Sequence, residues 1–285
     1  MRNFAAAKGL FIVLLAGGVC LSMQDYVGNP ALKLYVIECG HNQVTDQSVF
    51  SPGVNIGVGR EMAINCYLIR HPLGTMIWGT GLNDGLIDKP EGIRVANDNF
   101  LITVTKTLAS QLEEIGVAPA DVKFVSMSHM HPDHSGNGNM FAGATLLIQQ
   151  EEYDAAFGDD PGKYAFNPKF YGKLGAGPVI KLTGDHDVFQ DGSVVIKRSI
   201  GHTPGHQSLF LRLPETGAVL LSGDLWHFAA QREHKRVPKF NFSKELTLQS
   251  MERMEAFVAE SGATVWIEHD IDLDRTLKHA PEYYD

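Results

Sequence analysis

His129-Met130-His131-Pro132-Asp133-His134 is the stretch of this sequence that decides both its fold and its chemistry. It directly follows Lys123–Met127, an apolar run that predicts a buried strand. Imidazole nitrogens and carboxylate oxygens suit zinc and related divalent metals. Because alternate residues of an extended backbone point to the same side, His129 and His131 can reach one metal, and Asp133 and His134 can then face a second. Four potential ligands in six residues indicate a metal site rather than a solvated, histidine-rich turn.

Other predicted strands end in polar loops that hold further ligand candidates. His202-Thr203-Pro204-Gly205-His206 offers two histidines, Ser222-Gly223-Asp224 offers a carboxylate, and Glu268-His269-Asp270 offers another imidazole. Rigid strands that expose chemistry on their loops are typical of α/β architectures. The sequence therefore predicts an α/β fold in which several strand ends meet at one metal site.

The remaining pattern predicts alternating strands and helices. Gly40 to Glu61, rich in Gly, Asn, Ser and Pro, predicts a long loop, and loops of that length are often functional. Asp191-Gly192, between two apolar runs, predicts a hairpin. Strands are predicted at residues 32–38, 63–70, 74–78, 145–148, 208–213, 218–221 and 264–267, and helices at residues 104–115, from Gln150 onward, and at 244–259; residues 156–177 are predicted to be loop.

Taken together, these motifs resemble those of the metallo-β-lactamase superfamily, from about residue 32 to residue 270. The resemblance implies a four-layer αββα sandwich, here a single domain over residues 23–285, with two metals at one edge of the sheets. It implies that His129, His131 and His206 bind one metal, that Asp133, His134 and His269 bind the other, and that Asp224 bridges them. His202 would then be a structural loop residue. Two cations would make a bridging hydroxide available at neutral pH, and Asp133 could orient it or relay its proton.

Within the superfamily the chain most resembles the N-acyl-homoserine lactonases, which open the lactone ring of quorum-sensing signals. Two positions depart from that group. Gly79 stands where many members have an acidic residue, and His227 stands where many have a tyrosine that contacts the substrate carbonyl. His227 could serve the same purpose, or it could simply pack in its loop. Zinc is the expected metal, and iron, manganese and cobalt tolerate the same ligands.

Several other activities of the superfamily compete with this interpretation. Only 16 residues follow His269, which leaves no room for the helical extension of glyoxalase II. Asp224 argues against β-lactamases, which generally lack the bridging aspartate. Methyl-parathion-type phosphotriesterases share the whole ligand set and stay open, as does a non-catalytic module that only binds metal. An amphipathic small molecule is favoured as the substrate by Phe50, Trp226, Phe228, Phe240 and Phe242, although any of these could merely anchor a loop.

The composition limits partners and location. A formal net charge of -9 disfavours nucleic acid as a partner, because its binding depends on cationic side chains that neutralise phosphates.

Arg2 and Lys8 precede the apolar stretch Leu10–Leu21, which is too short to span a bilayer and predicts a signal peptide over residues 1–22. We therefore expect a secreted or periplasmic protein without stable membrane insertion, or an anchored one if the segment is not cleaved. Cys39 and Cys66 could form a disulfide or stay as buried thiols, and a homodimer is left open.

Overall fold

The long antiparallel pair at the centre of the fold shows how the sequence pattern builds the core. The computed structural model describes residues 32–285, so the predicted signal peptide lies outside the described residues. Strand β2 (Arg60–His71) is buried on both faces and pairs along its length with β1 (Lys33–Val44). Successive side chains of a strand point to opposite faces. Tyr67 and Ile69 accordingly join one hydrophobic core, and Cys66 and Leu68 join another.

The first sheet has eight strands and mixes antiparallel with parallel pairs. Its order is β4-β5-β1-β2-β3-β6-β7-β8, and the pairs from β3 to β8 are parallel. Besides β1 and β2 it contains β3 (Gly74–Trp78), β4 (Ile93–Val95), β5 (Phe100–Thr103), β6 (Val122–Ser126), β7 (Thr145–Gln149) and β8 (Val179–Leu182).

The second sheet has five strands in the order β13-β12-β11-β10-β9. They are β9 (His186–Asp187), β10 (Val194–Arg198), β11 (Gln207–Leu213), β12 (Gly217–Leu221) and β13 (Thr264–Trp266). The predicted hairpin around Asp191-Gly192 is the antiparallel pair of β9 and β10, although its turn is longer than two residues.

The helices are mostly short. They are α1 (Leu108–Glu114), α2 (Pro132–Ser135), α3 (Gln150–Ala156), α4 (Pro168–Tyr171), α5 (Ala229–His234), α6 (Lys244–Ser261) and α7 (Ile271–Asp274). The Ser243 hydroxyl caps α6 by accepting from the Leu246 N–H, and Gly262, with φ of 69°, ends it in the left-handed region. Within residues 32–285, no helix is both long enough and apolar enough to cross a bilayer.

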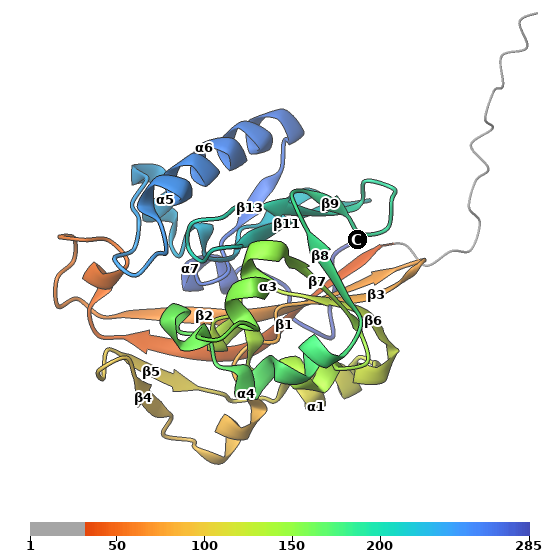
Figure 1. Cartoon of the computed structure of the whole chain (residues 1–285), viewed down its shortest axis with the longest axis horizontal. Coiled ribbons are helices and arrows are strands. Elements are labelled where there is room, and N and C mark those ends of the chain that lie inside the picture. The colour runs from red at the N-terminus through yellow and green to blue at the C-terminus, as the bar shows by residue number, and fades with distance from the viewer. Residues whose placement is uncertain (1–31) are drawn as a thin grey trace, which may run out of the picture.

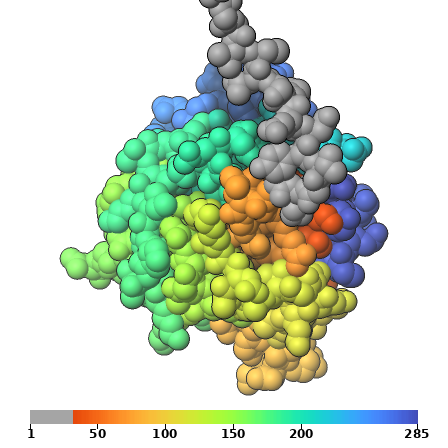
Figure 2. All heavy atoms as spheres, turned by 90° about the vertical axis from the view of Figure 1, so that its right-hand side faces the viewer, coloured from red at the N-terminus to blue at the C-terminus, as the bar shows by residue number. Residues whose placement is uncertain are grey.

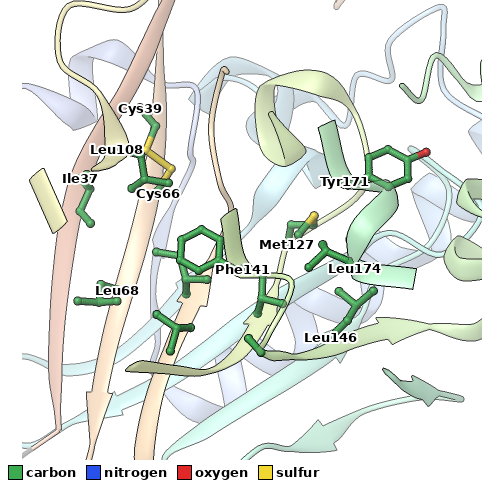
Figure 3. Close-up of a cluster of buried hydrophobic side chains, with 14 of the residues drawn as sticks. Ile37, Cys39, Cys66, Leu68, Leu108, Met127, Phe141, Leu146, Tyr171 and Leu174 are labelled. Atoms are coloured by element: carbon green, nitrogen blue, oxygen red, sulfur yellow. A yellow bond between two sulfur atoms is a disulfide. The ribbon is translucent and has the colours of Figure 1, made fainter. Parts of the chain in front are cut away.

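Among residues 32–285, three of the four apolar clusters lie between the two sheets or on their outer faces, and they separate four layers. Side chains from both sheets meet between them, among them Val36 of β1 and Leu211 of β11. Leu108 of α1 packs in a core on the outer face of the first sheet (Figure 3), and Met251 of α6 belongs with Leu220 to a core on the outer face of the second. In Figure 1, α6 and α1 lie on opposite sides of the two sheets. The predicted αββα sandwich is confirmed.

The predicted loop from Gly40 to Glu61 is shorter in the structure. Strand β1 continues to Val44 through an irregularity between Glu38 and His41, and β2 already begins at Arg60. Gly40 has φ of 136°, and a Cβ there would lie 2.6 Å from the Leu82 side chain. A glycine that typically predicts a break thus allows the strand to continue.

Cys39 and Cys66 form a disulfide across the β1–β2 pair, which decides between the two alternatives left by the sequence. Such bonds persist mainly in proteins that pass through an oxidising compartment. The bond therefore agrees with export, which stays a prediction.

The two ends of the described chain lie side by side. Leu34 and Tyr284 exchange both backbone hydrogen bonds, at 2.8 and 2.9 Å. Figure 2 shows the blue C-terminal segment beside the start of β1. The last residues therefore cover the beginning of β1, away from the strand ends that carry the ligand candidates.

Candidate metal centre

The ligand candidates lie in loops that follow strands of both sheets. His129 and His131 follow β6, and His134 belongs to α2. The other loops follow β10, β12 and β13. Gln207, the first residue of β11, joins the sheets because its backbone N–H donates to the Ser128 carbonyl oxygen at 2.9 Å and its Nε2 donates to Ser126 Oγ at 2.8 Å.

His129, His131, His202 and Asp224 form the first group of potential ligands. His202 Nε2 lies 3.1 Å from His129 Nε2, 3.2 Å from His131 Nδ1 and 3.3 Å from Asp224 Oδ2. One potential ligand atom from each residue lies within 4.8 Å of the others. Three imidazole nitrogens and a carboxylate oxygen that converge in this way can hold a divalent metal ion.

Asp133, His134 and His269 form the second group. The Nε2 atoms of His134 and His269 lie 3.2 Å apart. Asp133 Oδ1 lies 3.9 Å from His134 Nε2, and Asp133 Oδ2 lies 3.8 Å from His269 Nε2. The sequence predicted these three residues as one ligand set, and the structure brings them together.

Asp224 lies between the two groups, with one oxygen toward each. Oδ2 faces His202 and His129, and Oδ1 lies 3.2 Å from His134 Nε2 and 3.1 Å from His269 Nε2. Oδ1 is buried and accepts no hydrogen bond from any described residue. A buried carboxylate oxygen without a donor is costly unless a cation contacts it. This orphaned oxygen and its imidazole neighbours fit a pair of metal ions that Asp224 would bridge.

The assignment of His206 to the first group is contradicted by the geometry. Its Nδ1 donates to the Ser199 carbonyl oxygen at 2.9 Å, and its Nε2 accepts from the Asp224 N–H at 3.0 Å. Burial lowers the pKa of His206 to about 4, so the ring is the neutral form that can accept this bond. With both nitrogens engaged, His206 holds the backbone of Asp224 in place. His202, predicted to be structural, occupies the ligand position.

Neighbouring oxygens orient the imidazole rings of both groups, so that one nitrogen of each ring faces the other ligand atoms of its group. His202 Nδ1 lies 3.0 Å from Asn241 Oδ1, and His269 Nδ1 lies 2.7 Å from the Ala63 carbonyl oxygen. His131 is turned the other way, with Nε2 3.0 Å from the Tyr164 carbonyl oxygen. A donor bond of this kind leaves the other ring nitrogen unprotonated and available to a metal.

Burial favours the metal-binding protonation states of the histidines in the first group. It lowers the pKa values of His129 and His202 well below the usual range, which keeps both rings neutral. Burial alone would raise the pKa of Asp224, but His269 and His134 hold it well below its usual value. In the second group the direction is opposite: despite burial, Glu268 and Asp224 hold the pKa of His134 well above its usual value, and Asp224 raises the pKa of His269 to about 9. Divalent metals bind the deprotonated imidazole, so metal binding at this group would release protons.

A pocket of about 950 Å³ opens above both groups. Phe50, Phe240 and Phe242 line it, as the sequence suggested, whereas Trp226 and Phe228 are buried in the apolar cores and do not. Other apolar lining residues are Val49, Met62, Leu82, Val95, Phe100 and Ile102, and His131, Asp133, His202, Asp224, His227 and His269 provide polar groups.

The hairpin of β4 and β5, which was not among the predicted strands, supplies Val95, Phe100 and Ile102 to this wall. The run Phe100-Leu101-Ile102-Thr103 has the composition of a strand and could have predicted it. The predicted loop residues 156–177 likewise contain α4 and a lining residue, Tyr164.

His227 lies inside the site. Its Nε2 is 3.0 Å from Asp224 Oδ2, and its ring lies 4.7 Å from that of Phe50. Its Nδ1 is buried and has no hydrogen-bond partner among the described residues. His227 also lines the pocket, so the residue is within reach of a molecule bound there.

The arrangement of strands, loops and ligand groups agrees with a sequence comparison. The profile of the metallo-beta-lactamase superfamily matches residues 59–260. The chain belongs to this superfamily. It is thus a metallo-beta-lactamase-fold protein whose strand-end site could hold metal ions.

Curated relatives in the superfamily cover nearly the same length. The N-acyl homoserine lactonase AttM of Rhizobium johnstonii is 30% identical over 280 residues, which span 89% of this chain and 98% of the relative. AttM of Azorhizobium caulinodans is 29% identical over 89% of this chain and 99% of its own length. AiiA of Bacillus thuringiensis subsp. kurstaki is 28% identical over 88% of this chain and 98% of its own.

Solved structures agree with these relatives. An N-acyl homoserine lactone hydrolase with the product N-hexanoyl-L-homoserine at its catalytic metal centre superimposes with a TM-score of 0.77 and 27% identity, covering 89% of this chain and 99% of that one. A variant of Bacillus thuringiensis AiiA with N-decanoyl-L-homoserine at its active site has a TM-score of 0.76 and 27% identity, with the same coverage of both chains.

Proposed function

We propose that this metallo-beta-lactamase-fold protein is an N-acyl-homoserine lactonase, a metal-dependent hydrolase that opens the lactone ring. The observation that carries the proposal is the pair of ligand groups, joined by Asp224, at the base of a largely apolar pocket. A polar reacting ring beside an apolar tail is the substrate shape that such a pocket accommodates. The names of the curated relatives, and the homoserine products bound in similar structures, support the same substrate class.

We propose two divalent metal ions as the cofactors, with zinc the first expectation. His129, His131 and His202 would hold one ion, Asp133, His134 and His269 the other, and Asp224 both. When bound, such ions activate water at neutral pH and polarise the carbonyl under attack. The ligand set suits iron, manganese and cobalt as well.

The chain's own side chains supply orientation and proton transfer. Phe50, Phe240 and Phe242 would hold the acyl chain and exclude water from that side of the pocket. Asp133 is only half-buried and lines the pocket, so its carboxylate can take a proton during ring opening and release it to solvent. Opening the ring leaves a carboxylic acid, which ionises and releases one proton per turnover.

His227 is proposed to donate a hydrogen bond to the lactone carbonyl oxygen. We expect His227→Phe to lower kcat by about 100-fold, as loss of an oxyanion donor does elsewhere. His227→Tyr restores a donor and should recover most of the activity. Steady-state kinetics on one lactone compares the three proteins, and a Phe variant as active as the original would remove His227 from the mechanism.

A substrate panel on metal-quantified protein tests the proposed function. We expect N-hexanoyl-homoserine lactone to be hydrolysed with one proton released per turnover in a pH-stat, far faster than paraoxon or a β-lactam. Paraoxon turnover well above that of any lactone would instead establish a phosphotriesterase. Two metal equivalents with no hydrolysis of lactone, ester, β-lactam or phosphotriester would indicate a binding module.

A further inference from the structure

Glu152 is a buried carboxylate that the proposed mechanism does not use. It lies in the first turn of α3, directly after β7, with only 1% of its surface exposed. Oε1 accepts a hydrogen bond from the Met130 N–H at 2.9 Å. Oε2 accepts from the Thr203 hydroxyl at 2.7 Å and from the Gly205 N–H at 2.8 Å.

These donors belong to the two segments that carry the histidines of the first ligand group. Met130 stands between His129 and His131, and Thr203 follows His202. A Cβ at Gly205 would lie 2.3 Å from the Glu152 backbone nitrogen, so only glycine allows this close approach. One side chain therefore spans both segments and fixes the distance between them.

No such link from Glu152 reaches the second group. Asp224 receives its support from His206, and His269 from the Ala63 carbonyl oxygen. Asp133 and His134 are further along in α2, where the His134 N–H donates to the His131 carbonyl oxygen. Among the described residues, the direct contacts of the Glu152 carboxylate thus concern only the first group.

The cost of this arrangement indicates that the contacts matter. Burial raises the pKa of Glu152 to about 7, against the hydrogen bonds from Thr203, Gly205 and Met130. Within residues 32–285 its carboxylate forms no ion pair with a cationic side chain. A carboxylate surrounded only by neutral donors is expensive to bury, and an apolar residue of similar size would avoid that cost.

We propose that Glu152 is a positioning residue that aligns the His129–His131 segment with the His202–Gly205 segment and so sets the metal affinity of the first group. This inference rests on the proposed two-metal site. Residues that orient ligands without touching the metal typically change metal affinity about 10- to 100-fold when they are replaced. The effect should fall on the first group and leave the second largely intact.

Glu152→Gln tests the proposal, because it keeps the size of the side chain but replaces one acceptor oxygen with a donor. Zinc occupancy is measured by native mass spectrometry across a series of free-zinc buffers. We expect one zinc to bind about 10- to 100-fold more weakly and the other as in the original protein. Long-range ¹⁵N spectra of the imidazoles would show that His129, His131 and His202 change while His134 and His269 do not.

Glu151→Gln is the matched control, since the neighbouring carboxylate pairs with Arg198 instead of either ligand segment. It should leave both zinc affinities unchanged. Thr203→Val removes only one donor and is expected to weaken the same zinc to a smaller degree, which keeps the test valid if Glu152→Gln folds poorly. Equal weakening of both zincs, or of neither, would overturn the proposal. An original protein that binds none of zinc, iron, manganese and cobalt would instead overturn the proposed function.

Discussion

Asp224→Asn is expected to lower kcat for lactone hydrolysis by at least about 100-fold and to reduce the bound metal from two equivalents per chain to about one. The carboxylate directs Oδ2 toward the first group and Oδ1 toward the second. The neutral amide has only one acceptor oxygen, and its NH₂ group would face one of the cations. Metal analysis of the purified variant, combined with pH-stat kinetics at saturating lactone, measures both effects.

Asp191→Asn provides the control for this substitution. Asp191 pairs with His71 in the turn between β9 and β10, and it does not line the pocket. Metal content and kcat should therefore match those of the original protein. If Asp224→Asn also retained full activity and both metals, Asp224 would not be a bridging ligand.

His202→Gln and His206→Gln are expected to have different effects, because His202 is proposed as a metal ligand and His206 as the residue that holds the Asp224 backbone. His202→Gln should remove about one metal equivalent and lower kcat/KM by more than about 100-fold, because the first group loses one of its three imidazoles. Glutamine at residue 206 can still accept from the Asp224 N–H, so that variant should keep both metals and lose no more than about 10-fold in kcat/KM. Metal content and lactone kinetics, measured side by side, distinguish the two roles.

The opposite outcome would restore the assignment made from sequence. If His206→Gln lost a metal while His202→Gln kept both, His206 would be the ligand and the ring orientations described above would be wrong. Thermal unfolding of the metal-free variants shows whether either substitution acts by destabilising the fold instead.

Much of the sandwich could be predicted because its strands are apolar runs of ordinary length. Strands β3, β6 and β7 lie within a residue or two of the predicted ranges. The end of β1 was predicted too early, because a glycine such as Gly40 by itself predicts a break, whereas β2 and β5 pair with the backbone beyond it. The hairpin of β4 and β5 was missed because three- and four-residue strands give almost no periodic signal.

The sequence by itself determined the chemistry of this protein. The cluster His129–His134, followed by Asp224 and His269, predicts a two-metal hydrolytic site. So many histidine and aspartate side chains at the ends of predicted strands are typical of a metal site. Only the tertiary structure decided between His202 and His206. Both belong to one short motif. Which ring faces the ligand groups depends on Asn241, 39 residues from His202, and on the Asp224 backbone, 18 residues from His206, together with the nearby Ser199 carbonyl oxygen. Glu152 could not be predicted from sequence for the same reason, because its carboxylate contacts two segments that only the tertiary structure brings to it.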